Sequence, residues 1–105
     1  MTRLEAVLKA CEDKIAKEVV TIPIDEKLAI ADYFVIATGN SRNQTQAIAD
    51  EIEKVMAEMG SEPSGKEGYR EGSWILLDFG DIIVHIFTAE DRKYYDLERL
   101  WSNNK

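Results

Sequence analysis

The stretch WILLDFGDIIVHIF, residues 74–87, decides the fold because it consists of two apolar strands joined by a tight turn. A two-residue turn, at either Gly80-Asp81 or Phe79-Gly80, sorts the side chains onto the same two faces of a hairpin. One face is entirely apolar and carries Ile75, Leu77, Phe79, Ile82, Val84 and Ile86. We expect this face to pack against helices.

The second face of the hairpin, which we call the mixed face, carries Trp74, Leu76, Asp78, Ile83, His85 and Phe87. His85 is the only histidine of the chain, and Asp78 should lie near it across the strands. Two interpretations are open: another element covers the mixed face, or the face is exposed and docks a partner. A catalytic Asp78–His85 pair is a weaker interpretation, because the sequence places no Ser or Cys nucleophile beside it.

Length and composition indicate one globular domain, residues 1–105, with 45% apolar and 31% charged residues. A single cysteine excludes an internal disulfide and favours a reducing compartment, so we expect a cytoplasmic protein. The sequence has no apolar run long enough to cross a membrane. The net charge of −7 argues against direct nucleic-acid binding, which depends on Lys and Arg, and favours a basic partner.

Two helices are predicted before the hairpin, each opened by a capping box, TRLE at residues 2–5 and SRNQ at residues 41–44. The apolar stripe of the first helix is Leu4, Val7, Leu8, Cys11 and Ile15. The second helix turns inward Ile48, Ile52, Val55, Met56 and Met59. Gly60 should end this helix at the C′ position.

Two strands are also predicted before the hairpin. Residues 19–24 are β-branched, and Pro23 indicates a sheet edge or a strand end. Residues 32–38 are apolar nearly throughout, which is typical of a strand covered on both faces.

After the second helix, residues 62–72 are expected to form a polar loop interrupted by Tyr69. A last helix, capped by Thr88, should contain Tyr94, Leu97, Leu100 and Trp101. The order is then roughly α-β-β-α-β-β-α. It predicts an α/β domain with a mixed β-sheet packed with helices, in which the last two strands are antiparallel.

Metal and cofactor sites are not indicated. One His and one Cys are too few soft ligands for zinc. The turn TGNS, residues 38–41, could hold an anion at a helix N-terminus, but helix capping already explains Ser41. We therefore expect no bound cofactor.

Four segments, DYFVIATGNS, EGY, GSWILLDFGDIIVHIF and YYDLERLW, together resemble the ribosomal silencing factor family RsfS, also called Iojap-like proteins. The resemblance runs from about Leu4 to Trp101, with the segments in family order and spacing. It implies a nucleotidyltransferase-like fold without enzymatic activity. It also implies binding to universal ribosomal protein number fourteen at the intersubunit face of the large subunit. Such binding would block joining of the small subunit and lower translation, and some members are linked to large-subunit assembly.

On this interpretation the mixed face is the docking surface. Trp74 and Leu76 are its expected anchors, Tyr69 and Tyr95 lie at its edge, and the polar pair of Asp78 and His85 sets register and selectivity.

Two alternatives stay open. An active metal-dependent nucleotidyltransferase would need two carboxylates alternating on one strand, whereas Asp78 and Asp81 are three apart and straddle the turn. A structural module that forms a homodimer could pair the mixed face with itself.

Overall fold

The computed structural model describes residues 1–102. Its elements, in chain order, are α1 (Arg3–Asp13), β1 (Lys17–Pro23), the 3-10 helix η1 (Glu26–Leu28), β2 (Tyr33–Gly39), α2 (Arg42–Glu58), β3 (Gly65–Glu67), β4 (Trp74–Asp78), β5 (Ile82–Thr88), α3 (Ala89–Tyr95) and α4 (Leu97–Ser102). The predicted order of helices and strands is confirmed except in the region of β3 and at the C-terminal end.

The strands form one five-stranded sheet in the order β1-β2-β5-β4-β3. β2 and β5 pair in parallel and every other neighbouring pair is antiparallel, which confirms the predicted mixed sheet. β1 is an edge strand, as Pro23 indicated, and its register shifts between Lys17 and Val20. Gly80-Asp81 is the hairpin turn: Phe79 N–H donates to the carbonyl of Ile82 at 2.9 Å.

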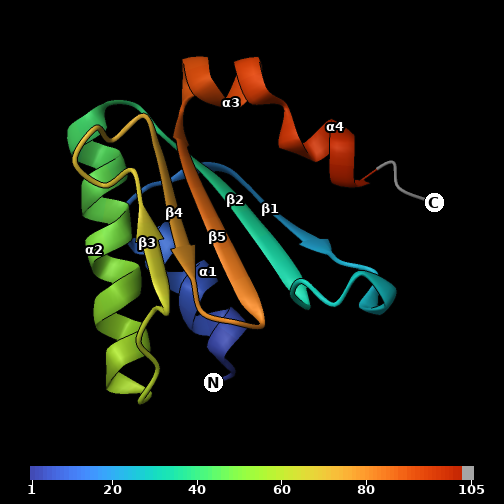
Figure 1. Ribbon diagram of the computed structural model, residues 1–105. Coiled ribbons are helices and arrows are strands. Elements are labelled where there is room, and N and C mark those ends of the chain that lie inside the picture. Colours follow the sequence, from blue (N-terminus) through green and yellow to red (C-terminus); the bar gives the residue numbers. More distant parts are fainter. Residues whose placement is uncertain (103–105) are drawn as a thin grey trace.

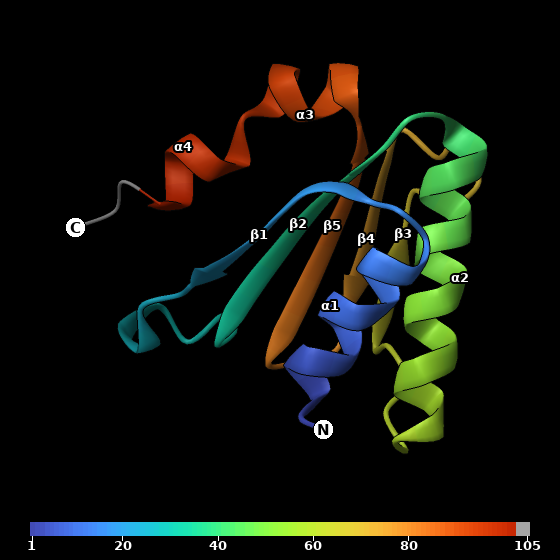
Figure 2. The same cartoon turned by 180° about the vertical axis from the view of Figure 1, so that it is seen from behind.

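Helices α1 and α2 lie side by side against one face of the sheet, as Figure 2 shows from that side. The apolar face of the hairpin packs into the core beneath them, as predicted. Helices α3 and α4 follow the carboxyl end of β5 and lie apart from α1 and α2 (Figure 1). Leu97 of α4 packs against the cluster that contains Ile83 and Phe87 of the mixed face. The two faces of the sheet are therefore covered very unequally.

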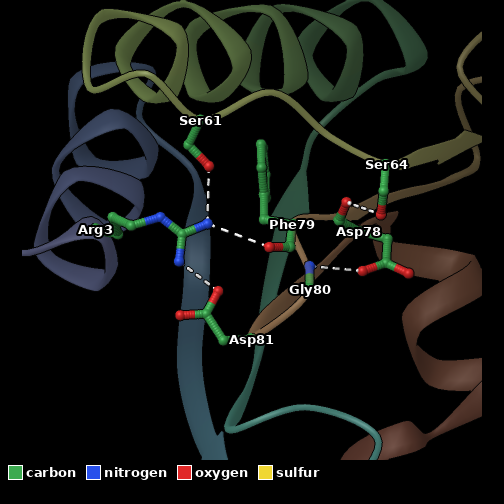
Figure 3. A network of polar contacts seen from close by, with 7 residues as sticks. All are labelled: Arg3, Ser61, Ser64, Asp78, Phe79, Gly80 and Asp81. Atoms are coloured by element: carbon green, nitrogen blue, oxygen red, sulfur yellow. Dashed lines mark hydrogen bonds and ion pairs between the residues drawn. The ribbon is translucent and has the colours of Figure 1, made fainter.

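Arg3 ties the start of α1 to the hairpin turn and to the end of α2 (Figure 3). Its guanidinium forms an ion pair with Asp81. It also donates to Ser61 Oγ at 2.8 Å and to the carbonyl of Phe79 at 3.2 Å. The backbone carbonyl of Asp81 in turn accepts from the N–H groups of Asp32 and Tyr33 at 2.7 and 3.1 Å. This one corner thus joins four segments that are distant in sequence.

The prediction of a polar loop at residues 62–72 is wrong in one part, because the strand β3 lies within this segment. The strand has the sequence Gly-Lys-Glu, so no apolar alternation marks it. It forms by pairing with β4 and is held to α2 by an ion pair between Lys66 and Glu53, 2.7 Å apart. Tertiary contacts, rather than local pattern, make this segment a strand.

The prediction of a single last helix is also wrong, because the helix is interrupted at Asp96 and forms two helices, α3 and α4. Asp96 adopts a left-handed conformation with φ 48°, which Asp tolerates better than most residues. Thr88 occupies the N-cap position of α3, but its side chain makes no capping hydrogen bond. The backbone of Trp101 is helical as predicted, while its side chain lies outside the described part of the chain.

The starts of α1 and α2 follow the predictions closely. The capping box of α1 is complete, with Thr2 and Glu5 bonding each other's backbone N–H. At α2, Ser41 caps the N–H of Gln44 as predicted, but the Gln44 side chain accepts from Asn40 rather than from Ser41. Met59 and Ile15, both predicted to face inward, are exposed.

The ends of α1 and α2 are alike in backbone and differ in side chain. Both helices close with paired hydrogen bonds of the Schellman type, from Ile15 and Ala16 at α1 and from Gly60 and Ser61 at α2. The C′ residue is left-handed in each case, with φ 59° at Ile15 and 77° at Gly60. Glycine adopts this conformation freely, whereas a β-branched residue is strained in it.

Replacing Ile15 with Gly should therefore stabilise the protein by about 0.5–1 kcal/mol, the relief of left-handed strain less the added freedom of the unfolded chain. The Ile15 side chain is 71% exposed, so little packing is lost. The measurement is the free energy of unfolding in urea. Gly60→Ala is the matched control and should lower this free energy, since nothing within 4 Å would obstruct the new methyl group and only its φ is unfavourable. Equal effects of the two substitutions would contradict this account.

Candidate functional site

The mixed face forms aligned rows across the sheet, set by strand register. His85 lies between Ile36 of β2 and Leu76 of β4, and Phe87 lies between Thr38 and Trp74. Every mixed-face residue of β5 is buried, while those of β4 are half-buried. Each of the two interpretations of the mixed face therefore applies to one strand. The mixed-face side chains of β5 are covered by other parts of the domain, whereas those of β4 are partly accessible to solvent.

A second, smaller core explains this difference. Its buried members are Ile22, Ile24, Phe34, Ile36, Ile83 and Phe87, and half-buried Val20, Ala31, Trp74, Leu76 and Leu97 pack around them. The half-buried aromatic and aliphatic side chains at the rim of this cluster shield its centre from solvent. At β4, the rim exposes part of its apolar side chains to solvent.

Trp74 is the centre of an aromatic group at this rim. Its ring centroid lies 5.0 Å from that of Phe87 and 4.5 Å from that of Tyr95. Tyr95 ends α3 and is 45% exposed. Trp74 and Tyr95 are thus in ring contact, and Leu76 lies on the same face of β4 as Trp74, half-buried like it.

His85 is buried rather than accessible at this rim, with 5% of its area exposed. Its Nδ1 accepts a hydrogen bond from Trp74 Nε1–H at 3.1 Å, and its ring centroid is 5.0 Å from that of Phe34. Burial lowers the pKa of His85 to about 4, because the apolar surroundings disfavour the imidazolium. The histidine is therefore neutral near pH 7.

The predicted polar pair of Asp78 and His85 does not form, because each side chain bonds elsewhere. Strand register places Asp78 opposite Ile83 and His85 opposite Leu76, so the two are diagonal neighbours. Asp78 Oδ1 accepts from Gly80 N–H at 2.8 Å and shapes the turn. The pair thus has neither the contact nor the solvent access that acid–base catalysis requires.

Tyr69 lies on the helix-covered side of the sheet, away from the mixed face. Its hydroxyl donates to Asp50 Oδ2 at 3.1 Å, and the Nζ of Lys66 is 4.1 Å from its ring centroid. The hydrogen bond to Asp50 raises the pKa of Tyr69. Of the six predicted contact residues, the structure separates Tyr69 from the other five.

Arg92 is a buried residue that the sequence did not single out. Its Nε donates to Glu98 Oε1 at 2.8 Å and its Nη1 donates to Thr38 Oγ1 at 2.8 Å and to the carbonyl of Glu18. These bonds hold α3 and α4 against β1 and β2, at the border of the mixed face. A spacing of six residues does not suggest a helical ion pair, and only the left-handed Asp96 brings Arg92 and Glu98 together.

Within residues 1–102, no group of three or more His, Cys, Asp or Glu side chains could hold a metal ion. The same part of the chain contains no helix that is both long and apolar enough to cross a membrane.

Comparison with known proteins points in one direction. Residues 1–105 match the profile of a family described as ribosomal silencing factor during starvation. The chain is 44% identical to the ribosomal silencing factor RsfS of Halalkalibacterium halodurans, covering 95% of this chain and 86% of that protein. It is also 31% identical to the mouse mitochondrial assembly of ribosomal large subunit protein 1, covering 83% of this chain and 40% of that protein. A crystal structure of a Chromobacterium violaceum protein superposes with a TM-score of 0.92 at 31% identity, covering 98% of this chain and 86% of that chain.

The buried histidine should make the stability of the fold depend on pH. The ordinary pKa of 6.5 applies in the unfolded chain and about 4 in the folded one, so the unfolded chain binds more protons between these values. The free energy of unfolding should therefore fall as pH falls from about 6.5 toward 4, by up to about 3 kcal/mol for this group. Urea titrations at a series of pH values measure it. The variant His85→Leu, which keeps every carboxylate, should lack this component, and parallel curves for the two proteins would refute it.

Proposed function

The chain belongs to the ribosomal silencing factor family, and from this premise we propose that it binds the large ribosomal subunit and prevents the small subunit from joining it. The proposed partner is universal ribosomal protein number fourteen, at the intersubunit face. The outcome is repression of translation in the cytoplasm. A contribution to large-subunit assembly is consistent with the name of the mouse relative.

The observation that carries this proposal is the accessible aromatic rim of the mixed face. Trp74 and Leu76 are half-buried on β4, and Tyr95 lies against Trp74. Tryptophan and tyrosine are enriched among the residues that dominate binding energy at protein interfaces, and the contacts around them exclude water. We assign Trp74, Leu76 and Tyr95 the role of anchors. We place Asp78, which is half-buried at the end of β4, at the polar periphery of the interface.

Charge supports a basic partner. The net charge of −7 favours rapid encounter with a positively charged protein surface and disfavours direct contact with RNA phosphates. A ribosomal protein that is basic and surrounded by RNA offers such a surface.

Size favours a steric mechanism. The domain measures 35 × 33 × 21 Å, too small to cover the interface between two ribosomal subunits. It must act by occupying one contact point that the small subunit also needs. Binding of the two would then be mutually exclusive.

We also propose that the protein is not an enzyme. Asp78 and Asp81, the two carboxylates considered from the sequence for a metal site, are bonded to other groups on opposite sides of the hairpin turn (Figure 3). Asp81 forms an ion pair with Arg3, while Asp78 accepts from Gly80 N–H. A nucleotidyltransferase would need both carboxylates directed at the same metal ions.

Replacing Trp74 with Ala should weaken binding to isolated large subunits by about thirtyfold or more, the usual cost of truncating a central aromatic anchor. Cosedimentation over a range of subunit concentrations measures the affinity. Tyr69→Ala is the matched control, because it removes a half-buried aromatic ring on the opposite face of the sheet and should leave binding unchanged. Equal losses from the two substitutions, or none from Trp74→Ala, would remove the mixed face from the proposal.

The order of addition should decide whether the protein blocks subunit joining by steric exclusion. Added before the subunits are mixed, it should suppress joining, and the block should weaken as small subunits are raised, since exclusive binding is a competition. Added to preformed ribosomes, it should have little effect until they dissociate. Gradient sedimentation measures both. Equal association of the protein with joined ribosomes and with free large subunits would refute the steric mechanism.

A further inference from the structure

The contact between Trp74 and His85 is the only hydrogen bond that the structure gives the imidazole within the described residues. Trp74 lies opposite Phe87, and His85 is two residues before Phe87 on the same strand. The indole therefore extends along the mixed face from one cross-strand row to the next. Its polar N–H points inward and its ring remains at the rim.

This bond determines which nitrogen of His85 carries the proton. Nδ1 accepts a hydrogen bond from the indole N–H, so Nδ1 is unprotonated. The proton of the neutral ring is therefore on Nε2. Nε2 is buried and has no hydrogen-bond partner among residues 1–102. One end of the imidazole is thus used and the other is left unsatisfied.

A histidine in this environment is not favourable for folding alone. A buried N–H without an acceptor is destabilising, and an aliphatic residue of similar size would avoid this loss. The surrounding cluster is apolar, with Phe34 and Ile36 on the adjacent strand. What His85 provides that leucine cannot is an acceptor for Trp74.

We infer that His85 is a positioning residue, which holds the Trp74 indole in the orientation used for docking. This inference rests on the proposed function, in which Trp74 is an anchor. A side chain already held in its bound orientation loses less conformational freedom on association, so the complex is tighter. His85 then contributes to affinity without touching the partner.

The test compares His85→Leu with His85→Asn in the full chain. Asparagine can place its Oδ1 near the position of Nδ1 and retain the acceptor, whereas leucine cannot. His85→Leu should bind isolated large subunits about three- to tenfold more weakly than the wild type, the loss expected for one neutral hydrogen bond. His85→Asn should recover most of this loss.

Three further measurements separate positioning from a general structural role. The His85→Leu variant should be about as resistant to urea at pH 7 as the wild type, because the buried unsatisfied N–H is gone, while the indole N–H that loses its acceptor belongs to a half-buried residue and can bond to water. In nuclear magnetic resonance spectra of the free protein, the Trp74 indole N–H should exchange slowly with solvent in the wild type and His85→Asn, and quickly in His85→Leu. In a Trp74→Phe background, which lacks the N–H, His85→Leu should cause no further loss of affinity.

The outcomes distinguish this inference from the proposed function. If the wild type fails to bind large subunits, the proposed function falls, and the positioning role falls with it. If the wild type binds but His85→Leu binds equally well, or loses as much affinity in the Trp74→Phe background, only the positioning role is overturned.

Discussion

The parallel pairing of β2 with β5 is the constraint on which the rest of the structure depends. Both strands are buried along most of their length, so both faces of the sheet must be covered. The long crossover between them supplies α2, which packs with α1 on one face. The chain that remains after β5 forms only two short helices in the described part. The mixed face must therefore be covered largely by its own side chains, and its aromatic rim follows from this shortage.

The features predictable from sequence were those that local pattern specifies. Alternation in residues 74–87 was enough to assign both faces of the hairpin, because a shift of one residue would have reversed every side chain. Helix caps at Thr2 and Ser41 followed from residue type. The strand β3 could not be found this way, since Gly-Lys-Glu has no apolar alternation and forms only against β4. The interruption of the helix at Asp96 could not be predicted either, because the surrounding sequence is compatible with a continuous helix and tertiary contacts determine where it ends.

For the candidate site, the sequence assigned the strand residues to their face of the sheet but not the depth of each residue on it. Trp74, Leu76 and Tyr95 do lie together, whereas His85 lies beneath them and Tyr69 lies on the other side of the sheet. Depth depends on the side chains of neighbouring strands: His85 is in contact with Phe34 of β2 and with Trp74 of β4, and a hairpin alone does not reveal the first of these contacts. The reach of the Trp74 indole to His85 is likewise a property of side-chain direction rather than of spacing.

The two edges of the sheet have a consequence for the behaviour of the protein at high concentration. β3 has three residues and carries Lys66, while β1 has a register shift and includes Pro23, which has no N–H. Short, charged or irregular edges are poor templates for another strand. Copies of this domain are thus discouraged from stacking into fibrils or continuous sheets when crowded.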